Sequence, residues 1–188
     1  MGYAIIRKKP GCDYLFKNLK PNMMIDSIYD IDFQELKNRN ILGLLIDVDN
    51  TLIKWDKKKA DEDLVQWFYK AKEENFLLCL ISNNTKERVV VFKEDIDIPA
   101  IHKALKPLTK SFYKGVGMLK LSREQVAVVG DQVFTDILGG NRAGLFTILV
   151  KPIPGKEFWW TTFVRKIEKV VLIILSKSDD IIIESKKK

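Results

Sequence analysis

Cysteine and histidine are scarce in this chain of 188 residues, which contains two cysteines and one histidine. Low cysteine content argues against a disulfide-stabilised secreted domain and is typical of proteins from a reducing cytosol. The sequence allows a disulfide between Cys12 and Cys79. However, Cys79 lies within an apolar run, where we expect it to act as a buried small hydrophobic residue. We expect no catalytic role for His102, the single histidine.

Segments that would define other classes of protein are also missing. The N-terminus lacks the continuous apolar region of a signal peptide, and no apolar stretch reaches the roughly 20 residues that span a bilayer. Zinc-finger spacing, an aromatic RNA-binding signature and a Walker lysine loop are all absent. The sequence therefore predicts a cytoplasmic protein without a transmembrane segment, and nucleic acid is not its expected partner.

What the chain does have is positive charge and enough apolar residues for a core. The formal net charge is +7, the isoelectric point is about 9.3, and hydrophobic residues make up 46% of the chain. A positive surplus favours anionic partners, which include anionic lipid and phosphorylated substrates as well as nucleic acid. Charge alone does not choose among these partners.

Apolar runs and helical patterns alternate along the chain. We expect buried strands at 41–48, 76–82, 126–130 and 146–150, a shorter strand at 98–101 and an extended segment at 26–30. Amphipathic patterns and capping residues predict helices at 32–38, 61–74, 86–94, 111–121 and 133–143, the last of them ended by Gly144. Such alternation predicts an α/β fold, with a doubly wound parallel sheet covered by helices on both faces.

Two aspartates lie at the C-terminal end of the first of these strands, where open α/β sheets place their active sites. Asp47 and Asp49 are separated by one residue, so both can point the same way from an extended backbone. One carboxylate can attack while the other exchanges a proton, and the pair can hold a hard cation. The simpler alternative is that a strand-end aspartate caps a turn, which Asn50 and Thr51 complete.

Three further polar groups follow in order along the chain: Ser82 and Asn83 after the second strand, Lys106 before Pro107, and Asp131 after Gly130, with Asp136 close behind. Hydroxyl, amide and ammonium groups can bind phosphate oxygens, and the added carboxylates can complete a cation site. Taken singly, each has a simpler explanation as a turn residue, a solvated lysine or a helix cap. Their common position at strand ends favours a shared site.

The four pieces together resemble the motifs of the haloacid dehalogenase (HAD) superfamily of phosphohydrolases. The flanking segments Leu19-Lys20-Pro21 and Asn141-Arg142-Ala143-Gly144 extend the resemblance over about residues 19–170. Within the superfamily the chain is similar to the YqeG family of subclass IIIA phosphatases, which are relatives of the phosphatidylglycerophosphate phosphatases of mitochondria and plastids. The resemblance implies an HAD-like, Rossmann-like fold and a phosphomonoesterase that requires Mg²⁺.

The resemblance also implies a role for each residue of the motifs. Asp47 would be the nucleophile that forms an aspartyl-phosphate, and Asp49 would protonate the leaving group and later activate water. Ser82 and Lys106 would hold phosphoryl oxygens, with Asn83 as a helper. Magnesium would be held by Asp47, the backbone carbonyl of Asp49 and Asp131, with Asp136 a weaker candidate through water or in the second shell.

The spacing between the motifs leaves no room for a cap domain. The segments 51–82 and 82–106 hold little more than one helix and one strand each. By the resemblance, a capless site goes with large substrates such as polymers, proteins or lipid headgroups, although some capless members close their sites by oligomerising. Phosphatidylglycerophosphate is one candidate; a soluble phosphomonoester, a phosphoprotein, and a non-catalytic basic binding protein on the same fold are alternatives.

Segments outside a core at 41–155 have separate expected roles. Residues 1–40 would form an N-terminal extension packed on the core, and 156–188 a C-terminal helix and basic tail. On a helix over 158–175 an apolar stripe would lie opposite basic residues, as in helices that bind a membrane interface. The stripe contains Trp160, Phe163, Val164 and Ile167, and the basic residues are Arg165, Lys166 and Lys169. This would place the protein at the membrane periphery; packing on the sheet or in a dimer contact is the alternative.

Overall fold

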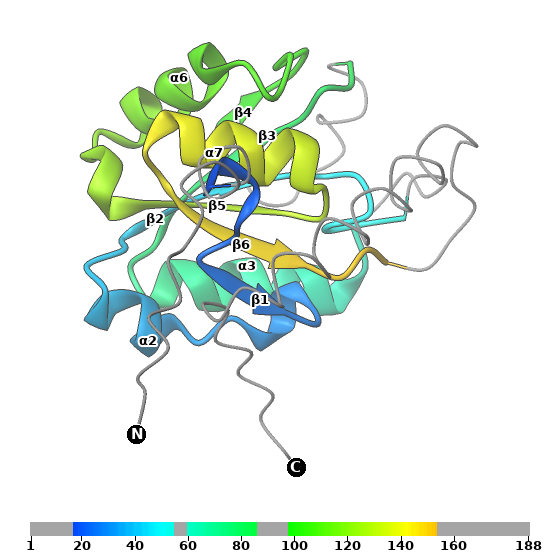
Figure 1. Cartoon of the computed structure of the whole chain (residues 1–188). Coiled ribbons are helices and arrows are strands. Elements are labelled where there is room, and N and C mark those ends of the chain that lie inside the picture. The colour runs from blue at the N-terminus through cyan, green and yellow to red at the C-terminus, as the bar shows by residue number, and fades with distance from the viewer. Residues whose placement is uncertain (1–16, 55–59, 86–97, 154–188) are drawn as a thin grey trace, which may run out of the picture.

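The structure is a computed structural model of the chain, and it describes residues 17–54, 60–85 and 98–153. Within these ranges six strands form one sheet, in the order β1-β6-β5-β2-β3-β4, and every neighbouring pair is parallel (Figure 1). The strands are β1 (Met23–Ile25), β2 (Gly43–Ile46), β3 (Leu77–Ile81), β4 (Ala100–Ile101), β5 (Val126–Gly130) and β6 (Phe146–Val150).

Helices cover both faces of this sheet, so the predicted α/β architecture is confirmed. Figure 1 shows α2 and α3 below the sheet and α6 and α7 above it. The helices are α2 (Phe33–Asn38), α3 (Glu62–Glu73), α6 (Thr109–Leu119) and α7 (Leu138–Ala143), and a π-helical turn, η4 (Val133–Ile137), leads into α7. Short 3₁₀ turns are η1 (Lys17–Leu19), η2 (Ile28–Asp30) and η3 (Arg123–Gln125).

Hydrophobic core residues lie on both faces of the sheet because successive strand residues point to opposite faces. Leu44 packs into the core between the sheet and helices α2 and α3, whereas its neighbour Leu45 packs into the core between the sheet and α6. Cys79 lies in the second core as a free thiol, and burial raises its pKa to about 12, despite the lowering effect of Lys114. Such a thiol acts as a small hydrophobic residue, as expected from the sequence.

The N-terminal segment differs from the sequence prediction. Residues 26–30 are not extended, because the Ser27 hydroxyl accepts the backbone N–H of Tyr29 and caps the 3₁₀ turn at Ile28–Asp30. The strand lies earlier, at β1, and pairs with β6 at the sheet edge. Just before β1, the Asn22 side chain accepts the backbone N–H of Thr147, which fastens the two ends of the described chain together.

The remaining boundaries agree with the prediction to within a few residues. Helix α6 begins two residues earlier than expected and ends where Lys120 adopts a left-handed backbone with φ of 55°. Gly144, with φ of 74°, ends α7 as predicted, because glycine takes this conformation without a steric penalty. The helices expected at 86–94 and 158–175 lie outside the described residues. Among the described helices, none has the length and hydrophobicity that crossing a bilayer requires.

The order of the strands creates a topological switch point at the carboxyl ends of β2 and β5, and we call this region the crevice. From β2 the chain moves outward to β3 and β4, and then returns through α6 to β5 on the other side of β2. The loops that follow β2 and β5 therefore diverge, and open α/β sheets bind ligands at such a point. Asp47 directly follows β2 and Asp131 directly follows β5, so both lie at this crevice.

Candidate active site

The chain turns sharply after β2, and this turn holds the first two predicted site residues. The Asp47 backbone N–H donates to the Val129 carbonyl at 2.9 Å, so Asp47 continues the hydrogen bonding of β2 with β5. Three residues later Asn50 adopts a left-handed backbone with φ of 60°, and its N–H donates to the Ile53 carbonyl at 2.7 Å. Asparagine tolerates this conformation better than most residues. The turn thus keeps Asp47 and Asp49 at the crevice.

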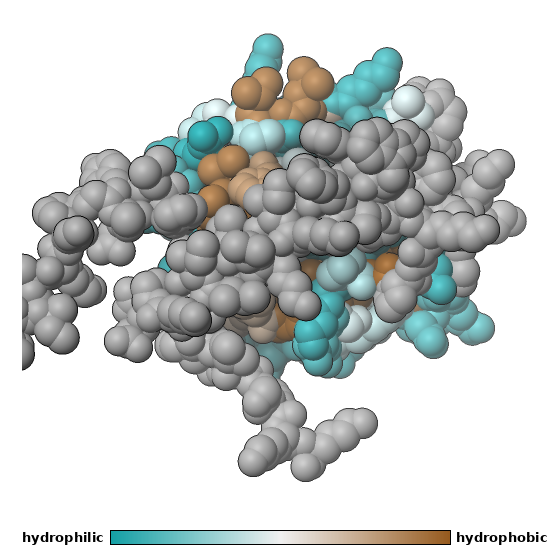
Figure 2. Space-filling view, turned by 45° about the vertical axis from the view of Figure 1, so that its right-hand side comes forward, coloured by the Kyte–Doolittle hydropathy of each residue, from teal (hydrophilic) through white to brown (hydrophobic). Residues whose placement is uncertain are grey.

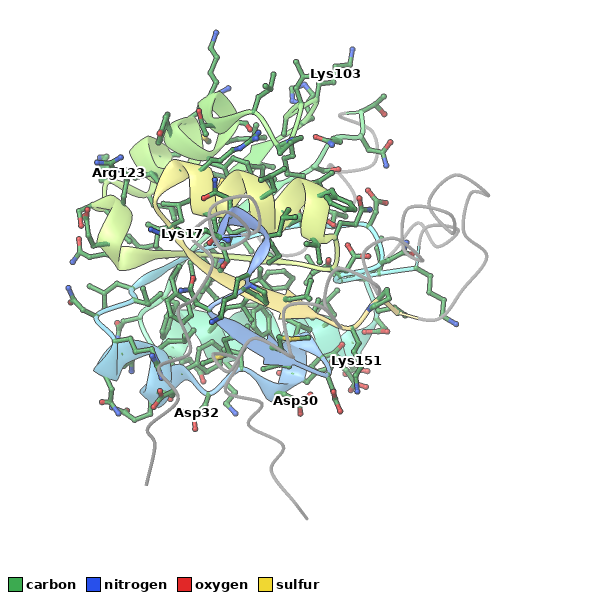
Figure 3. The ribbon with its side chains drawn as sticks, in the orientation of Figure 1. Lys17, Asp30, Asp32, Lys103, Arg123 and Lys151 are labelled. Atoms are coloured by element: carbon green, nitrogen blue, oxygen red, sulfur yellow. The ribbon has the colours of Figure 1, made fainter. Side chains whose placement is uncertain are left out.

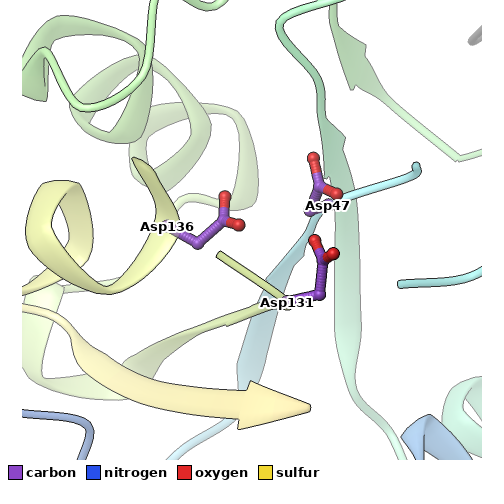
Figure 4. Close-up of side chains that lie close together, drawn as sticks. All are labelled: Asp47, Asp131 and Asp136. Carbon is purple, nitrogen blue, oxygen red and sulfur yellow. The ribbon is translucent and has the colours of Figure 1, made fainter. Parts of the chain in front are cut away.

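Three buried carboxylates meet there. One carboxylate oxygen from each of Asp47, Asp131 and Asp136 lies within 4.8 Å of the other two (Figure 4). The Thr51 hydroxyl lies 3.3 Å from Oδ2 of Asp47 and 3.2 Å from Oδ1 of Asp131, so it bridges two of the three. The sequence pattern predicts only a turn role for Thr51, and its position after two strand-end aspartates is the one signal of this bridging role.

Lys106 supplies positive charge to this cluster. Its Nζ donates to Oδ1 of Asp47 at 2.5 Å, to Oδ1 of Asp136 at 2.6 Å and to the Ile81 carbonyl at 3.2 Å, which uses all three ammonium protons. Burial alone would lower the pKa of Lys106, but the charges of Asp136 and Asp47 outweigh it and raise the pKa above its ordinary value. Lys106 is therefore a fixed cation within the site.

The lysine does not relieve all the repulsion at Asp47. Burial raises the pKa of Asp47 well above its ordinary value; Lys106 opposes this rise, while the charges of Asp136 and Asp131 add to it. A divalent cation beside these carboxylates would favour their ionised forms. Hard oxygen ligands on a buried acidic cluster are the donor set that Mg²⁺ prefers, so the residues present fit this metal.

Asp136 reaches the cluster because of a glycine in β5. A Cβ atom at Gly130 would lie 2.5 Å from Oδ2 of Asp136, far inside normal contact distance. The same oxygen accepts the backbone N–H of Gln132 at 3.2 Å, while Oδ1 accepts from Lys106. Both oxygens of Asp136 therefore have protein donors, and its main contact is with Lys106.

Asp49 points to a second group of polar residues on the adjacent strand end. Its Oδ2 accepts from Nδ2 of Asn84 at 2.8 Å and from the Ser82 hydroxyl at 3.4 Å. The buried Ser82 hydroxyl in turn accepts the backbone N–H of Asn84 at 3.0 Å. The sequence motif predicts a site role for Ser82 but not for Asn84, because an Asn-Asn-Thr run after a strand has the composition of an ordinary turn.

Asn83 faces away from the carboxylates, toward the backbone of Lys106. Its amide oxygen accepts the Lys106 N–H at 2.7 Å, and its amide nitrogen donates to the Lys106 carbonyl at 3.2 Å. Both ends of the amide are therefore engaged. A role of Asn83 in phosphate binding, which the family resemblance implies, stays a prediction; in the structure its contacts fix the loop that carries Lys106.

Known structures share the fold. The cobalt-bound form of the deoxy-D-mannose-octulosonate 8-phosphate phosphatase YrbI from Haemophilus influenzae matches with a TM-score of 0.51 at 14% identity, covering 77% of this chain and 96% of that one. An uncharacterized protein from Listeria monocytogenes serotype 4b matches at 0.50 and 15% identity, covering 72% and 99%. The α/β fold expected from the sequence is thereby confirmed.

The sequence of the chain matches one family of phosphatases. A family model described as "Mitochondrial PGP phosphatase" matches residues 14–153. "Probable phosphatase YqeG" of Bacillus subtilis (strain 168) is 40% identical over 167 residues, which are 89% of this chain and 97% of that protein. The chain belongs to this family of HAD-fold phosphatases. "Phosphatidylglycerophosphate phosphatase 1, chloroplastic/mitochondrial" of Arabidopsis thaliana is 24% identical, over 84% of this chain and 47% of its own length.

Proposed function

We propose that this phosphatase is a magnesium-dependent phosphomonoesterase that acts through an aspartyl-phosphate on Asp47. The observation that carries the proposal is the pairing of Lys106 with Asp47, at 2.5 Å, inside a buried cluster of three carboxylates. A phosphoryl transition state needs an in-line nucleophile and concentrated positive charge. The Asp47 carboxylate beside the Lys106 ammonium supports both requirements.

In the proposed reaction, a carboxylate oxygen of Asp47 attacks phosphorus and the bond between phosphorus and the ester oxygen breaks. Asp49 gives its proton to the departing alkoxide. Lys106 and Ser82 hold the phosphoryl oxygens, for which each redirects a proton that it now donates to Asp47 or to Asp49. Asp49 then takes a proton from water, which attacks the phosphorus of the aspartyl-phosphate and releases inorganic phosphate. The hydrogen bonds from Asn84 and Ser82 support this role, because they hold the Asp49 carboxylate beside the crevice.

Magnesium would be held by the carboxylates of Asp47 and Asp131 and by the backbone carbonyl of Asp49. When bound, it would offset the negative charge of substrate phosphate and carboxylates together. Asp136 fits a supporting role better than direct coordination, because its two oxygens already accept from Lys106 and from the Gln132 N–H. Asn83 we assign to holding the Lys106 backbone.

For the substrate we propose a phosphorylated lipid headgroup, with phosphatidylglycerophosphate as the first candidate. The description of the matching family and the name of the Arabidopsis relative both refer to this lipid. The short segments between the motifs also favour a large substrate, since they leave no cap domain over the crevice. A soluble phosphomonoester and a phosphoprotein stay open. A purely binding role is disfavoured, because it has no need of a lysine buried among carboxylates.

The test compares the wild type with Asp47→Asn on an aryl phosphate, with added Mg²⁺ and with EDTA. We expect hydrolysis only by the wild type with Mg²⁺, because an amide cannot attack phosphorus, while circular dichroism shows the same fold for both proteins. Phosphate release from phosphatidylglycerophosphate in mixed micelles, beside soluble phosphomonoesters, then ranks the substrates. Wild-type turnover by purified Asp47→Asn, or full activity of metal-free protein, would show the proposed chemistry to be wrong.

A further inference from the structure

Large apolar side chains gather on the surface beside the candidate active site. Of the seven large hydrophobic residues that are exposed among those described, four lie between residues 105 and 118. Leu105 and Leu108 are the most exposed of all, at 67% and 59%, and they stand on either side of the buried Lys106. Tyr113 and Met118 follow on α6, at 44% and 40%. Figure 2 shows hydrophobic surface at this end of the molecule, between hydrophilic side chains.

Local physical chemistry does not favour leucine at either position. Leu105 has a left-handed backbone, with φ of 56°, a conformation suited to glycine or asparagine rather than to a branched side chain. Leu108 occupies the N-cap of α6 without a side-chain cap hydrogen bond, where Ser, Thr, Asp or Asn is typical. Two leucines at unfavourable, solvent-exposed positions contribute little to the fold. Such breaks of local rules are expected at functional surfaces.

Within the described segment 98–122, which carries these leucines, the charged residues are all of one sign. From residue 98 to residue 122 the sequence contains five lysines and no aspartate or glutamate. Lys106 is buried in the site, whereas Lys103, Lys110 and Lys114 are exposed. Lys110, Tyr113 and Lys114 share the outer face of α6, since helical residues three and four apart are neighbours. Figure 3 shows Lys103 at the periphery of the molecule, near the start of this region.

We propose that this surface, which we call the basic apolar lip, docks on an anionic lipid bilayer. The lip consists of Leu105, Leu108 and Tyr113 with Lys103, Lys110 and Lys114. Leucine and tyrosine side chains would enter the headgroup region, and the lysines would contact anionic headgroups; apolar and basic groups combine in this way on interfacial surfaces. A second copy of the chain fits less well, because a symmetric contact would bring lysines against lysines.

The lip also connects the membrane to the chemistry, and this step rests on the proposed function. Lys106 turns its ammonium toward Asp47, while the side chains on either side of the Lys106-Pro107 pair turn to solvent. A bilayer touching Leu105 and Leu108 would therefore lie against the loop that carries Lys106 to the site. A phosphate carried on a lipid headgroup could then reach Asp47 without leaving the membrane surface.

The test uses the full chain with the double variant Leu105→Asn/Leu108→Ser. Both replacements suit the local backbone, so the variant should melt at the same temperature as the wild type or higher. In EDTA, with no turnover, we expect its partitioning onto phosphatidylglycerol-containing vesicles at low salt to fall at least tenfold. Leu77→Thr is the matched control. Leu77 is also exposed, but it begins β3, at the end of the strands opposite to the carboxyl ends that carry Asp47 and Asp131, and its loss should leave vesicle binding unchanged.

Activity measurements separate this proposal from the proposed function. We expect the double variant to keep wild-type turnover of a soluble aryl phosphate and to lose most of its turnover of a phosphorylated lipid in vesicles. Equal vesicle binding by variant and wild type would overturn the proposal that the lip binds membrane. A variant that differs from the wild type only in its oligomeric state on gel filtration would overturn it as well. If the wild type hydrolyses no phosphomonoester, the proposed function fails, while the vesicle measurement in EDTA still decides whether the lip binds membrane.

Discussion

At the scale of single residues, Lys106 is the point on which the site depends. Its ammonium joins Asp47 to Asp136, and its backbone is held by the side chain of Asn83. An ammonium buried among carboxylates is effective only in one position, because a shift of about 1 Å would break short, charge-assisted hydrogen bonds. The residues that hold Lys106 should therefore affect catalysis without touching substrate.

Asn83→Ala tests this dependence. We expect kcat on an aryl phosphate to fall by about one to two orders of magnitude, because two buried backbone groups of Lys106 lose their partners. In a Lys106→Ala background the same substitution should have little further effect, since nothing remains to be positioned. Steady-state kinetics of the four proteins give the coupling. An unchanged kcat with a raised KM for Asn83→Ala alone would instead favour the phosphate-binding role that the sequence suggested.

The residues of the site were predictable from the sequence to different degrees. Asp47, Asp131 and Lys106 follow strands or precede a proline in recognisable motifs, and the structure brings them together. Thr51 and Asn84 were missed, because a hydroxyl or amide in a turn carries no pattern of its own. The direction of the Asn83 amide was also beyond the sequence, since it depends on a loop 23 residues away.

At the scale of elements, glycines as well as apolar residues determine how closely the strands and helices pack. Gly130 ends β5 and leaves space for Asp136, which arrives from the following π-helical turn. Gly117, by contrast, lies within α6, and a Cβ there would meet no atom within 4 Å. Packing therefore requires a glycine at position 130, whereas the described structure has room for a side chain at position 117.

Substitution by alanine should show this contrast. We expect Gly117→Ala to stabilise the protein by about 0.5–1 kcal/mol, because alanine favours a helix interior. Gly130→Ala should destabilise it by about 1–3 kcal/mol and sharply reduce activity, because the new methyl group overlaps the Asp136 carboxylate. Urea unfolding of both variants beside the wild type measures the two effects. Similar stability changes of the same sign would contradict the argument.

Most elements followed from periodicity, and the exceptions have physical reasons. Long apolar runs gave β2, β3, β5 and β6, because strands buried on both faces are apolar throughout. The edge strand β1 was missed: it has three residues, all only partly buried, and is held by pairing with a strand more than a hundred residues later. No local pattern can report a partner at such a distance.

At the scale of the whole molecule, the acidic cluster links stability to pH and to metal. The pKa of Asp47 is raised in the folded state, so the folded protein binds this proton more tightly than the unfolded chain does. Without metal, stability should therefore fall as the pH rises from the ordinary carboxyl range through the raised pKa of Asp47. A cation that binds the ionised cluster should restore stability above that range.

Thermal melts in EDTA and in Mg²⁺ test this linkage. We expect metal-free wild type to lose stability as the pH rises through the raised pKa of Asp47, and Asp47→Asn to lose less, because it has no proton to release at that position. Mg²⁺ at about 100 times its dissociation constant should stabilise the wild type by about 2.7 kcal/mol at pH 8. Asp131→Asn should reduce that gain. Equal melting temperatures with and without Mg²⁺ for the wild type would show that the cluster does not bind this metal.

The pairing of β1 with β6 also constrains how the protein is made. Met23 lies opposite Ile148 in the sheet, so among the described strands the first to leave the ribosome pairs with the last. While β2, β3 and β5 can already pair, a nascent chain that ends before β6 has no partner strand for β1. Closure of this sheet edge is therefore a late event in biosynthesis, and until then the exposed flank of β5 is open to other strands.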